Sequence, residues 1–174
     1  MGCERKILGS NILEIHPQLA FLDAFGNQDL NISKKNVSSH FIISATIIDS
    51  KDFDKIDQDI NIIKNKFFSG SQIKSSNVGP DDDRRIKILK EIADLNIKAI
   101  CFVIDKNKLT TPGFQYKTSF IKHTHKLIYK ELYRAYPRLK VLSDSYGTEG
   151  FMKGFSQYIQ GIHPLDIFNY LKFN

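Results

Sequence analysis

The sequence predicts an α/β protein in which helices flank a β-sheet. Apolar runs of strand length occur at residues 19–25, 40–48, 98–105 and 139–142. After the second run, stretches with the three- and four-residue apolar spacing of amphipathic helices separate the strands. The 174 residues, 41% of them hydrophobic, can bury one substantial core, so we expect residues 1–174 to form a single domain.

The first strand carries a single acid close to a glycine. Residues 19–25 are apolar except for Asp23, and Gly26 follows them. A buried carboxylate without a partner is costly, so Asp23 needs a cation, a hydrogen-bond donor or water. It either caps the turn at Gly26 or presents its carboxylate in a cleft. The polar residues 27–39 predict a connecting loop, and the nearly continuous apolar content of 40–48 predicts a strand covered on both faces.

The middle of the chain predicts two helices that pack on the sheet. Over residues 52–68 the apolar residues form one helical stripe, made of Phe53, Ile56, Ile60, Ile63 and Phe67. Residues 72–76 predict a short strand or extended edge. The acids at 81–83 precede the next helix, and we interpret them as capping groups of its first turn rather than as a metal-binding cluster.

A second carboxylate ends the next strand. Residues 98–105 form the clearest buried strand of the sequence, and its last residue is Asp105. Neighbouring strands that each present an acid at the carboxyl end would bring Asp23 and Asp105 together, which favours a metal site. The alternative is that Asp105 begins the polar turn after the strand. We interpret Cys101, inside the strand, as a small core residue rather than a nucleophile.

Residues 114–136 predict a long amphipathic helix. Its inward face is expected to hold Tyr116, Phe120, Leu127, Ile128, Leu132 and Tyr136. His123 and His125 are two residues apart and project in different directions, so we interpret them as surface or packing residues rather than as ligands of one ion. The outer face is expected to carry a row of basic residues at four-residue spacing, Lys122, Lys126, Lys130 and Arg134. This basic row is either a solvated face or a surface that contacts the phosphates of a nucleic acid.

The last predicted strand, residues 139–142, is followed directly by a third acid near a strand end, Asp144. A helix that carries apolar residues at helical spacing and ends at Gly161 is expected to cover the sheet. The tail, residues 162–174, is aromatic and apolar but shows no complete pattern.

Four short motifs, taken in order, resemble a known family. They are Phe21-Leu22-Asp23-Ala24-Phe25-Gly26, then Ser39-His40-Phe41-Ile42-Ile43-Ser44-Ala45, then Ile73-Lys74-Ser75-Ser76 with Arg84 downstream, and finally Val141-Leu142-Ser143-Asp144-Ser145. Their order and spacing resemble the bacterial family of unknown function numbered thirty-eight hundred. The opening motif of that family is usually Asp-Glu-Ser-Gly, so Ala24 stands here at the position of the second acid.

The resemblance implies a ribonuclease-H-like fold, a mixed sheet flanked by helices. In enzymes of that fold, clustered carboxylates hold Mg²⁺ or Mn²⁺, which activate water for phosphodiester hydrolysis. Carried over to this sequence, Asp23 and Asp144 match the family's acids and Lys74 matches its Ile-Lys-Ser motif. Asp105 is a further candidate ligand, followed by Glu149. Family members usually continue with another strand and an acid-bearing helix, so we expect this chain to lack a C-terminal segment.

The function implied by the resemblance is a metal-dependent nuclease that cuts RNA or DNA, with its activity lost through Ala24. By analogy, such a domain could serve in a toxin or a phage-defence system. The alternative is a non-catalytic nucleic-acid-binding or assembly module that keeps the same fold. A partner protein or a second copy of the chain is compatible with either function.

Charge and hydropathy give a coarser expectation. The formal net charge of +6 favours polyanionic partners such as nucleic acid. No apolar run approaches the roughly 20 residues of a membrane span, and the N-terminus lacks the apolar core of a signal peptide. We therefore expect a cytoplasmic protein that does not bind membranes.

Overall fold

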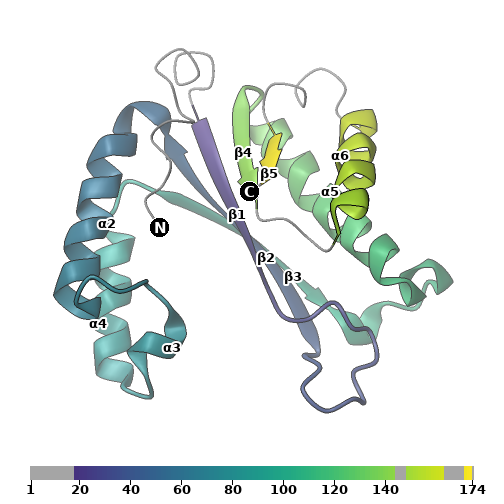
Figure 1. Ribbon diagram of the computed structural model, residues 1–174, viewed down its shortest axis with the longest axis horizontal. Helices are drawn as coiled ribbons and strands as arrows, with labels where there is room; N and C mark the ends of the chain where they lie inside the picture. Colours follow the sequence, from purple (N-terminus) through teal and green to yellow (C-terminus); the bar gives the residue numbers. More distant parts are fainter. Residues whose placement is uncertain (1–17, 144–147, 163–170, 174) are drawn as a thin grey trace.

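The computed structural model describes residues 18–143, 148–162 and 171–173. Its sheet has five strands in the order β3-β2-β1-β4-β5 (Figure 1). The strands are β1 (Gln18–Phe25), β2 (His40–Asp49), β3 (Lys98–Asp105), β4 (Leu139–Ser143) and β5 (Leu171–Phe173). Strands β1, β2 and β3 pair antiparallel, whereas β1 with β4 and β4 with β5 pair parallel. The α/β prediction is confirmed.

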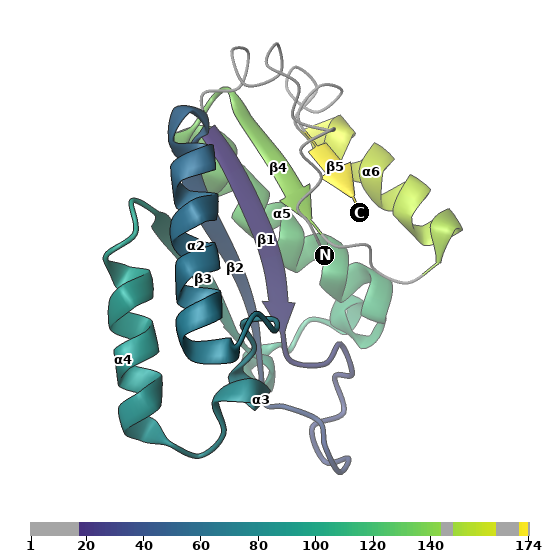
Figure 2. The same cartoon turned by 60° about the vertical axis from the view of Figure 1, so that its left-hand side comes forward.

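Helices lie on both faces of this sheet (Figure 2). On one face are α2 (Phe53–Phe68), α3 (Ser75–Val78) and α4 (Asp82–Ala93), all inserted between β2 and β3. On the other face are α5 (Lys117–Ala135) and α6 (Glu149–Ile162), on either side of β4 in the chain. Three 3₁₀ turns complete the described elements: η1 (Ser50–Asp52), η2 (Lys106–Lys108) and η3 (Pro112–Gln115).

The alternation of side chains along β1 divides the core into two layers. Ala20 and Leu22 belong to the larger cluster, which includes buried residues of α5 and α6. Leu19 and Phe21 point to the opposite face and pack with Ile56 of α2. The face to which each β1 residue points is therefore set by its position in the strand.

The helix beginning at Asp82 starts as the sequence predicted. The Asp81 carboxylate accepts a hydrogen bond from the backbone N–H of Arg84 at 2.9 Å, which satisfies one of the free amides of the first turn. Of the short strand or extended edge predicted at 72–76, only an extended Lys74 is present, because no strand forms there and Ser75–Val78 forms the short helix α3. The apolar Ile73 in this segment faces the cavity under α2 instead of pairing in the sheet.

Strand β3 is less buried than its composition suggested. It is an edge strand of the sheet, and Cys101 and Val103 are exposed on the face that carries α2 and α4, whereas Ile100, Phe102 and Ile104 pack against the cluster on the other face. Of the expected inward face of the long helix, Phe120, Ile128 and Leu132 are buried in α5, but Tyr116, its N-cap residue, is 67% exposed and Leu127 is 37% exposed. The tail, which showed no complete pattern, contributes the strand β5. In the described part of the chain, no helix has the length and apolar content of a membrane span.

Lys106 is buried, which the sequence did not suggest. Its ammonium donates hydrogen bonds to the Asn27 carbonyl at 2.7 Å, the Asn27 side-chain oxygen at 3.0 Å and the Asp29 carbonyl at 3.0 Å. Burial lowers the pKa of Lys106, and the nearby Asp29 partly opposes this. The lysine therefore fastens the β1–β2 loop to the end of β3.

His125 is a packing residue, as one of the two sequence interpretations had it. It is fully buried in α5, its ring meets Phe155 edge-on at 5.4 Å, and its Nδ1–H donates to the Ile121 carbonyl at 2.9 Å. Burial lowers the pKa of His125 to about 4. The ring is therefore neutral in the folded protein at pH 7.

The stability of the protein is expected to fall as the pH drops from about 6.5 to about 4. In this window the unfolded chain protonates His125 and the folded chain does not, so unfolding takes up a proton. The contribution of His125 is complete above pH 6.5, and its loss by pH 4 amounts to about 3 kcal/mol. Urea unfolding of the native chain, His125→Phe and the control His123→Gln across these pH values measures it. Equal pH slopes for the native chain and His125→Phe would contradict the assignment.

Candidate active site at the end of β1

Asp23 lies where the described pairing between β1 and β4 ends. The last described pair of that parallel ladder is Leu22 with Ser143, and on the other side Asp23 pairs with Ser44 of β2. The Asp23 side chain is exposed, and one carboxylate oxygen accepts the Ala24 backbone N–H at 2.8 Å. Among the described residues, no hydrogen bond or ion pair engages its second oxygen. This oxygen can therefore accept a ligand.

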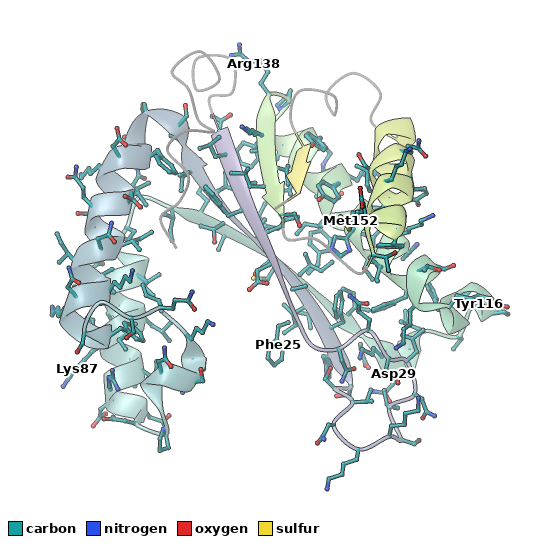
Figure 3. The ribbon with its side chains drawn as sticks, viewed as in Figure 1. Phe25, Asp29, Lys87, Tyr116, Arg138 and Met152 are labelled. Atoms are coloured by element: carbon teal, nitrogen blue, oxygen red, sulfur yellow. The ribbon has the colours of Figure 1, made fainter. Side chains whose placement is uncertain are left out.

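Ala24 and Asp23 point to opposite faces of the sheet. Asp23 shares the face of Phe21, beside α2, whereas Ala24 is half-buried against the larger core cluster below α5 and α6. Phe25 returns to the Asp23 face and is 71% exposed (Figure 3). A glutamate at position 24 would therefore leave the strand on the side away from the Asp23 carboxylate.

Gly26 determines how the chain leaves β1. Its φ is +97°, a conformation that side chains rarely adopt. A Cβ atom at this position would lie 2.7 Å from the His40 carbonyl oxygen and 2.9 Å from Ser38 Oγ. Only glycine fits without moving the backbone. The described hydrogen bond of the Asp23 carboxylate is to the Ala24 N–H, within β1 and not in the turn at Gly26.

Asp105 is distant from Asp23. Asp23 pairs with Ser44, Ser44 pairs with Cys101, and Asp105 lies four residues further along β3. At about 3.3 Å per residue and about 4.8 Å per strand, the two positions are roughly 16 Å apart, so one ion cannot bind both acids. The expectation that β1 and β3 would bring these acids together is thus corrected, because β2 lies between the two strands.

The Asp105 carboxylate has a local role instead. It accepts the backbone N–H of Asn107 at 3.0 Å and the Asn107 side-chain amide at 2.9 Å. The side-chain hydrogen bond is the main cause that lowers the pKa of Asp105, followed by the backbone one. Asp105 therefore begins the polar turn η2, the alternative that the sequence left open.

Lys74 flanks the same sheet face as Asp23. It is exposed and extended just before α3, and its neighbour Ile73 lines a cavity of about 400 Å³ together with Phe21, two residues before Asp23. No hydrogen bond or ion pair engages the Lys74 ammonium within the described ranges. Lys74 therefore remains available to an anionic ligand on this face.

Two arginines hold the segment that follows Lys74. Arg84 donates hydrogen bonds to the carbonyls of Phe67 and Val78, and Arg85 donates to Ser75 Oγ at 2.8 Å and to the Gly79 carbonyl at 2.9 Å. These contacts fix α3 between the end of α2 and the start of α4. The Arg84 downstream of the Ile-Lys-Ser-Ser motif thus has a structural role, and the hydroxyl of Ser75 is already engaged.

Two acid candidates remain, Asp144 and Glu149. Asp144 follows Ser143 in the chain but lies outside the described residues. Glu149 is exposed in the first turn of α6, whose Phe151 N–H bonds to Thr148 Oγ1 at 3.3 Å. Within the residues that the structure describes, no three His, Cys, Asp or Glu side chains gather into a metal-binding group.

Comparison with solved structures defines the fold class. The chain is similar to ribonuclease H2 from Pyrococcus horikoshii OT3, with a TM-score of 0.51 and 12% identity, over 90% of this chain and 62% of that one. The chain thus spans less than two thirds of that relative. Together with the strand order, this similarity shows a ribonuclease-H-like fold.

Two further solved structures are similar at lower scores. RNase H3 from Aquifex aeolicus matches with a TM-score of 0.49 and 16% identity, over 86% of this chain and 52% of that one. Bst-RNase HIII in complex with Mn²⁺ matches with a TM-score of 0.47 and 12% identity, over 85% of this chain and 42% of that one. No family model and no curated protein matches the sequence.

Proposed function

We propose that this protein is a metal-dependent nuclease that hydrolyses phosphodiester bonds of RNA or DNA at the end of β1. The observation that carries the proposal is the parallel β1–β4 register, in which Leu22 pairs with Ser143. Asp23 follows the first of these residues in the chain and Asp144 follows the second. Ligands of α/β proteins bind at the carboxyl ends of two neighbouring strands from which the chain continues toward opposite edges of the sheet. Strands β1 and β4 are such a pair, because β1 is followed by β2 on one side and β4 by β5 on the other.

The donor chemistry of this position suits Mg²⁺ or Mn²⁺. Both are hard cations that prefer carboxylate oxygens, and Asp23 offers an exposed oxygen that no described residue engages. Asp23 and Asp144 would hold the ion, which when bound supplies activation of water and stabilisation of the leaving oxygen. Lys74 would bind a substrate phosphate as a point charge.

Ala24 supports a second candidate function. The resembled family has an acid at this position, and the methyl group here packs against the core and supplies no ligand. A chain that has lost one acid could retain the fold as a nucleic-acid-binding or assembly module. In either case we propose a bacterial system of toxin or phage-defence type as its setting, by analogy alone.

Cleavage assays test the nuclease proposal directly. Labelled single- and double-stranded RNA and DNA are incubated with the native chain and with Ala24→Glu, in Mg²⁺, in Mn²⁺ and in EDTA. We expect metal-dependent cleavage by the native chain and no gain from Ala24→Glu, because a glutamate at position 24 would leave β1 on the side away from the Asp23 carboxylate. If the native chain is folded, binds nucleic acid and cuts nothing with either metal, the module is the better account.

Lys74→Ala is expected to weaken nucleic-acid binding by about tenfold at low salt and to leave the melting temperature unchanged. The ammonium would lose a charge-assisted contact to phosphate but no contact within the described fold. Lys87→Ala, which also removes an exposed charge, from α4, is the matched control. A clear loss of thermal stability with unaltered binding would show that Lys74 is a structural residue.

A further inference from the structure

The outer surface of α5 and α6 combines uncompensated lysines with accessible aromatic rings. The basic row of the sequence is present on α5, where Lys130 is exposed and Lys122 and Lys126 are half-buried. This α5–α6 surface lies on the opposite side of the sheet from Asp23 and α4 (Figures 1 and 3). The candidate active site accounts for none of these residues.

The described residues do not neutralise the charge of this surface. Glu131 is the only acid in α5, and it forms an ion pair with Arg134. Glu149 is the only acid in α6. Lys122, Lys126 and Lys130 form no ion pair with any described residue. Successive lysines of the row are about 6 Å apart along the helix, so three positive charges form a continuous line.

Aromatic rings border this line at its N-terminal end. The Lys122 ammonium lies 5.5 Å from the ring centroid of Tyr158 on α6, and His123 meets Phe114 edge-on at 4.9 Å. Around them is an open pocket of about 650 Å³, lined by Thr111, Phe114, Ser119, Lys122, His123 and Tyr158. This volume lies in the range of small-molecule sites and is sufficient for a nucleobase.

We propose that the α5–α6 surface binds single-stranded nucleic acid, with one unstacked base in the pocket and the backbone along the lysine row. A line of cations with stacking surfaces beside it is the usual arrangement for binding single strands. A duplex could use only the lysines, because its bases remain stacked with each other. An acidic peptide or an anionic membrane would likewise match the charge but not the pocket with its aromatic lining.

The inference is independent of the metal site and has its own test. Fluorescence anisotropy in EDTA measures binding of labelled oligo(dT), oligo(U) and a duplex of equal length to the native chain, Lys126→Ala/Lys130→Ala and Tyr158→Ala. Lys87→Ala/Lys90→Ala is the matched control, because it removes two exposed charges from α4 on the other face. Circular dichroism melts confirm that each variant is folded, and Tyr158→Leu replaces Tyr158→Ala if the latter is unstable.

We expect Lys126→Ala/Lys130→Ala to bind both oligonucleotides about tenfold more weakly at low salt. Its slope of log K against log salt should be smaller by about 1.4, since each phosphate contact contributes about 0.7 for a single strand. Tyr158→Ala should weaken single-strand binding by about tenfold and leave duplex binding unchanged. The oligo(dT) and oligo(U) arms show whether DNA, RNA or both are bound.

Three results would overturn the inference. The first is an equal loss of binding in Lys87→Ala/Lys90→Ala, which would show a general effect of net charge. The second is duplex binding that is at least as tight as single-strand binding and equally sensitive to Tyr158→Ala. The third is loss of binding to phosphatidylserine vesicles, but not to oligonucleotides, in Lys126→Ala/Lys130→Ala. If the native chain cuts nucleic acid but gives one of these three results, the proposed nuclease function stands and only the proposal for the α5–α6 surface fails.

Discussion

Asp23→Asn is expected to lower the affinity of the protein for Mn²⁺ by about 100-fold and to reduce any metal-dependent cleavage by at least the same factor. The substitution keeps the size of the side chain and the hydrogen bond that its oxygen accepts from the Ala24 N–H. It removes the negative charge and one anionic oxygen at the only described acid beside the end of the β1–β4 ladder. Isothermal titration with Mn²⁺ and a cleavage assay measure the two effects.

Asp105→Asn is the matched control for this substitution. It makes the same chemical change at the end of β3, roughly 16 Å away along the sheet. Because Asp105 caps the turn η2, the variant should bind Mn²⁺ as the native chain does. Equal losses in the two variants would show either that both acids serve one site or that Mn²⁺ binds only through general charge.

Gly26→Ala is expected to lower the free energy of unfolding by about 3 kcal/mol, the largest effect on stability among the changes considered. The added methyl would be strained at a φ of +97° and would lie 2.7 Å from the His40 carbonyl oxygen. It would also lie 2.9 Å from Ser38 Oγ, which donates a hydrogen bond to that same carbonyl at 2.8 Å. Urea denaturation gives the change.

Gly113→Ala provides the comparison, because a Cβ atom there would meet nothing within 4 Å and its backbone is not in the left-handed region. We expect this variant to be within about 0.5 kcal/mol of the native chain. The same midpoint shift in both variants would mean that the turn after β1 tolerates a side chain. A shift confined to Gly26→Ala would show that the chain direction beside Asp23 depends on glycine.

The elements that the sequence predicted well are those with strong local patterns. Helix α2 repeats apolar residues every three or four positions, Asp81 is a cap, and the runs of β1 and β2 are mostly apolar. Local spacing is sufficient in these cases because the side chains that face the core recur with the period of a helix or of a strand.

The errors concern features that depend on distant parts of the chain. The composition of β3 does not reveal that it is an edge strand, so Cys101 was expected in the core and is exposed. Ile73 resembled part of a strand because it is apolar, but it faces a cavity beneath α2. Lys106 is buried by carbonyls about eighty positions earlier in the chain, and no local pattern signals this contact.

The candidate site shows the same division. The sequence identified Asp23 as a single acid in an apolar strand, and the structure leaves it exposed with one oxygen available. The relation of Asp23 to Asp105 required the strand order, which separates them by β2. The register between Leu22 and Ser143 joins residues more than one hundred positions apart, so only the folded sheet reveals it.

Isothermal titration of the native chain with Mn²⁺ at pH 7 and low salt, repeated with Asp23→Asn, tests the central proposal most directly. We predict a saturable site in the native chain that is weakened by about 100-fold in the variant while both proteins remain folded. The absence of saturable binding by the native chain, or identical binding curves for the two proteins, would contradict a metal-dependent site at the end of β1.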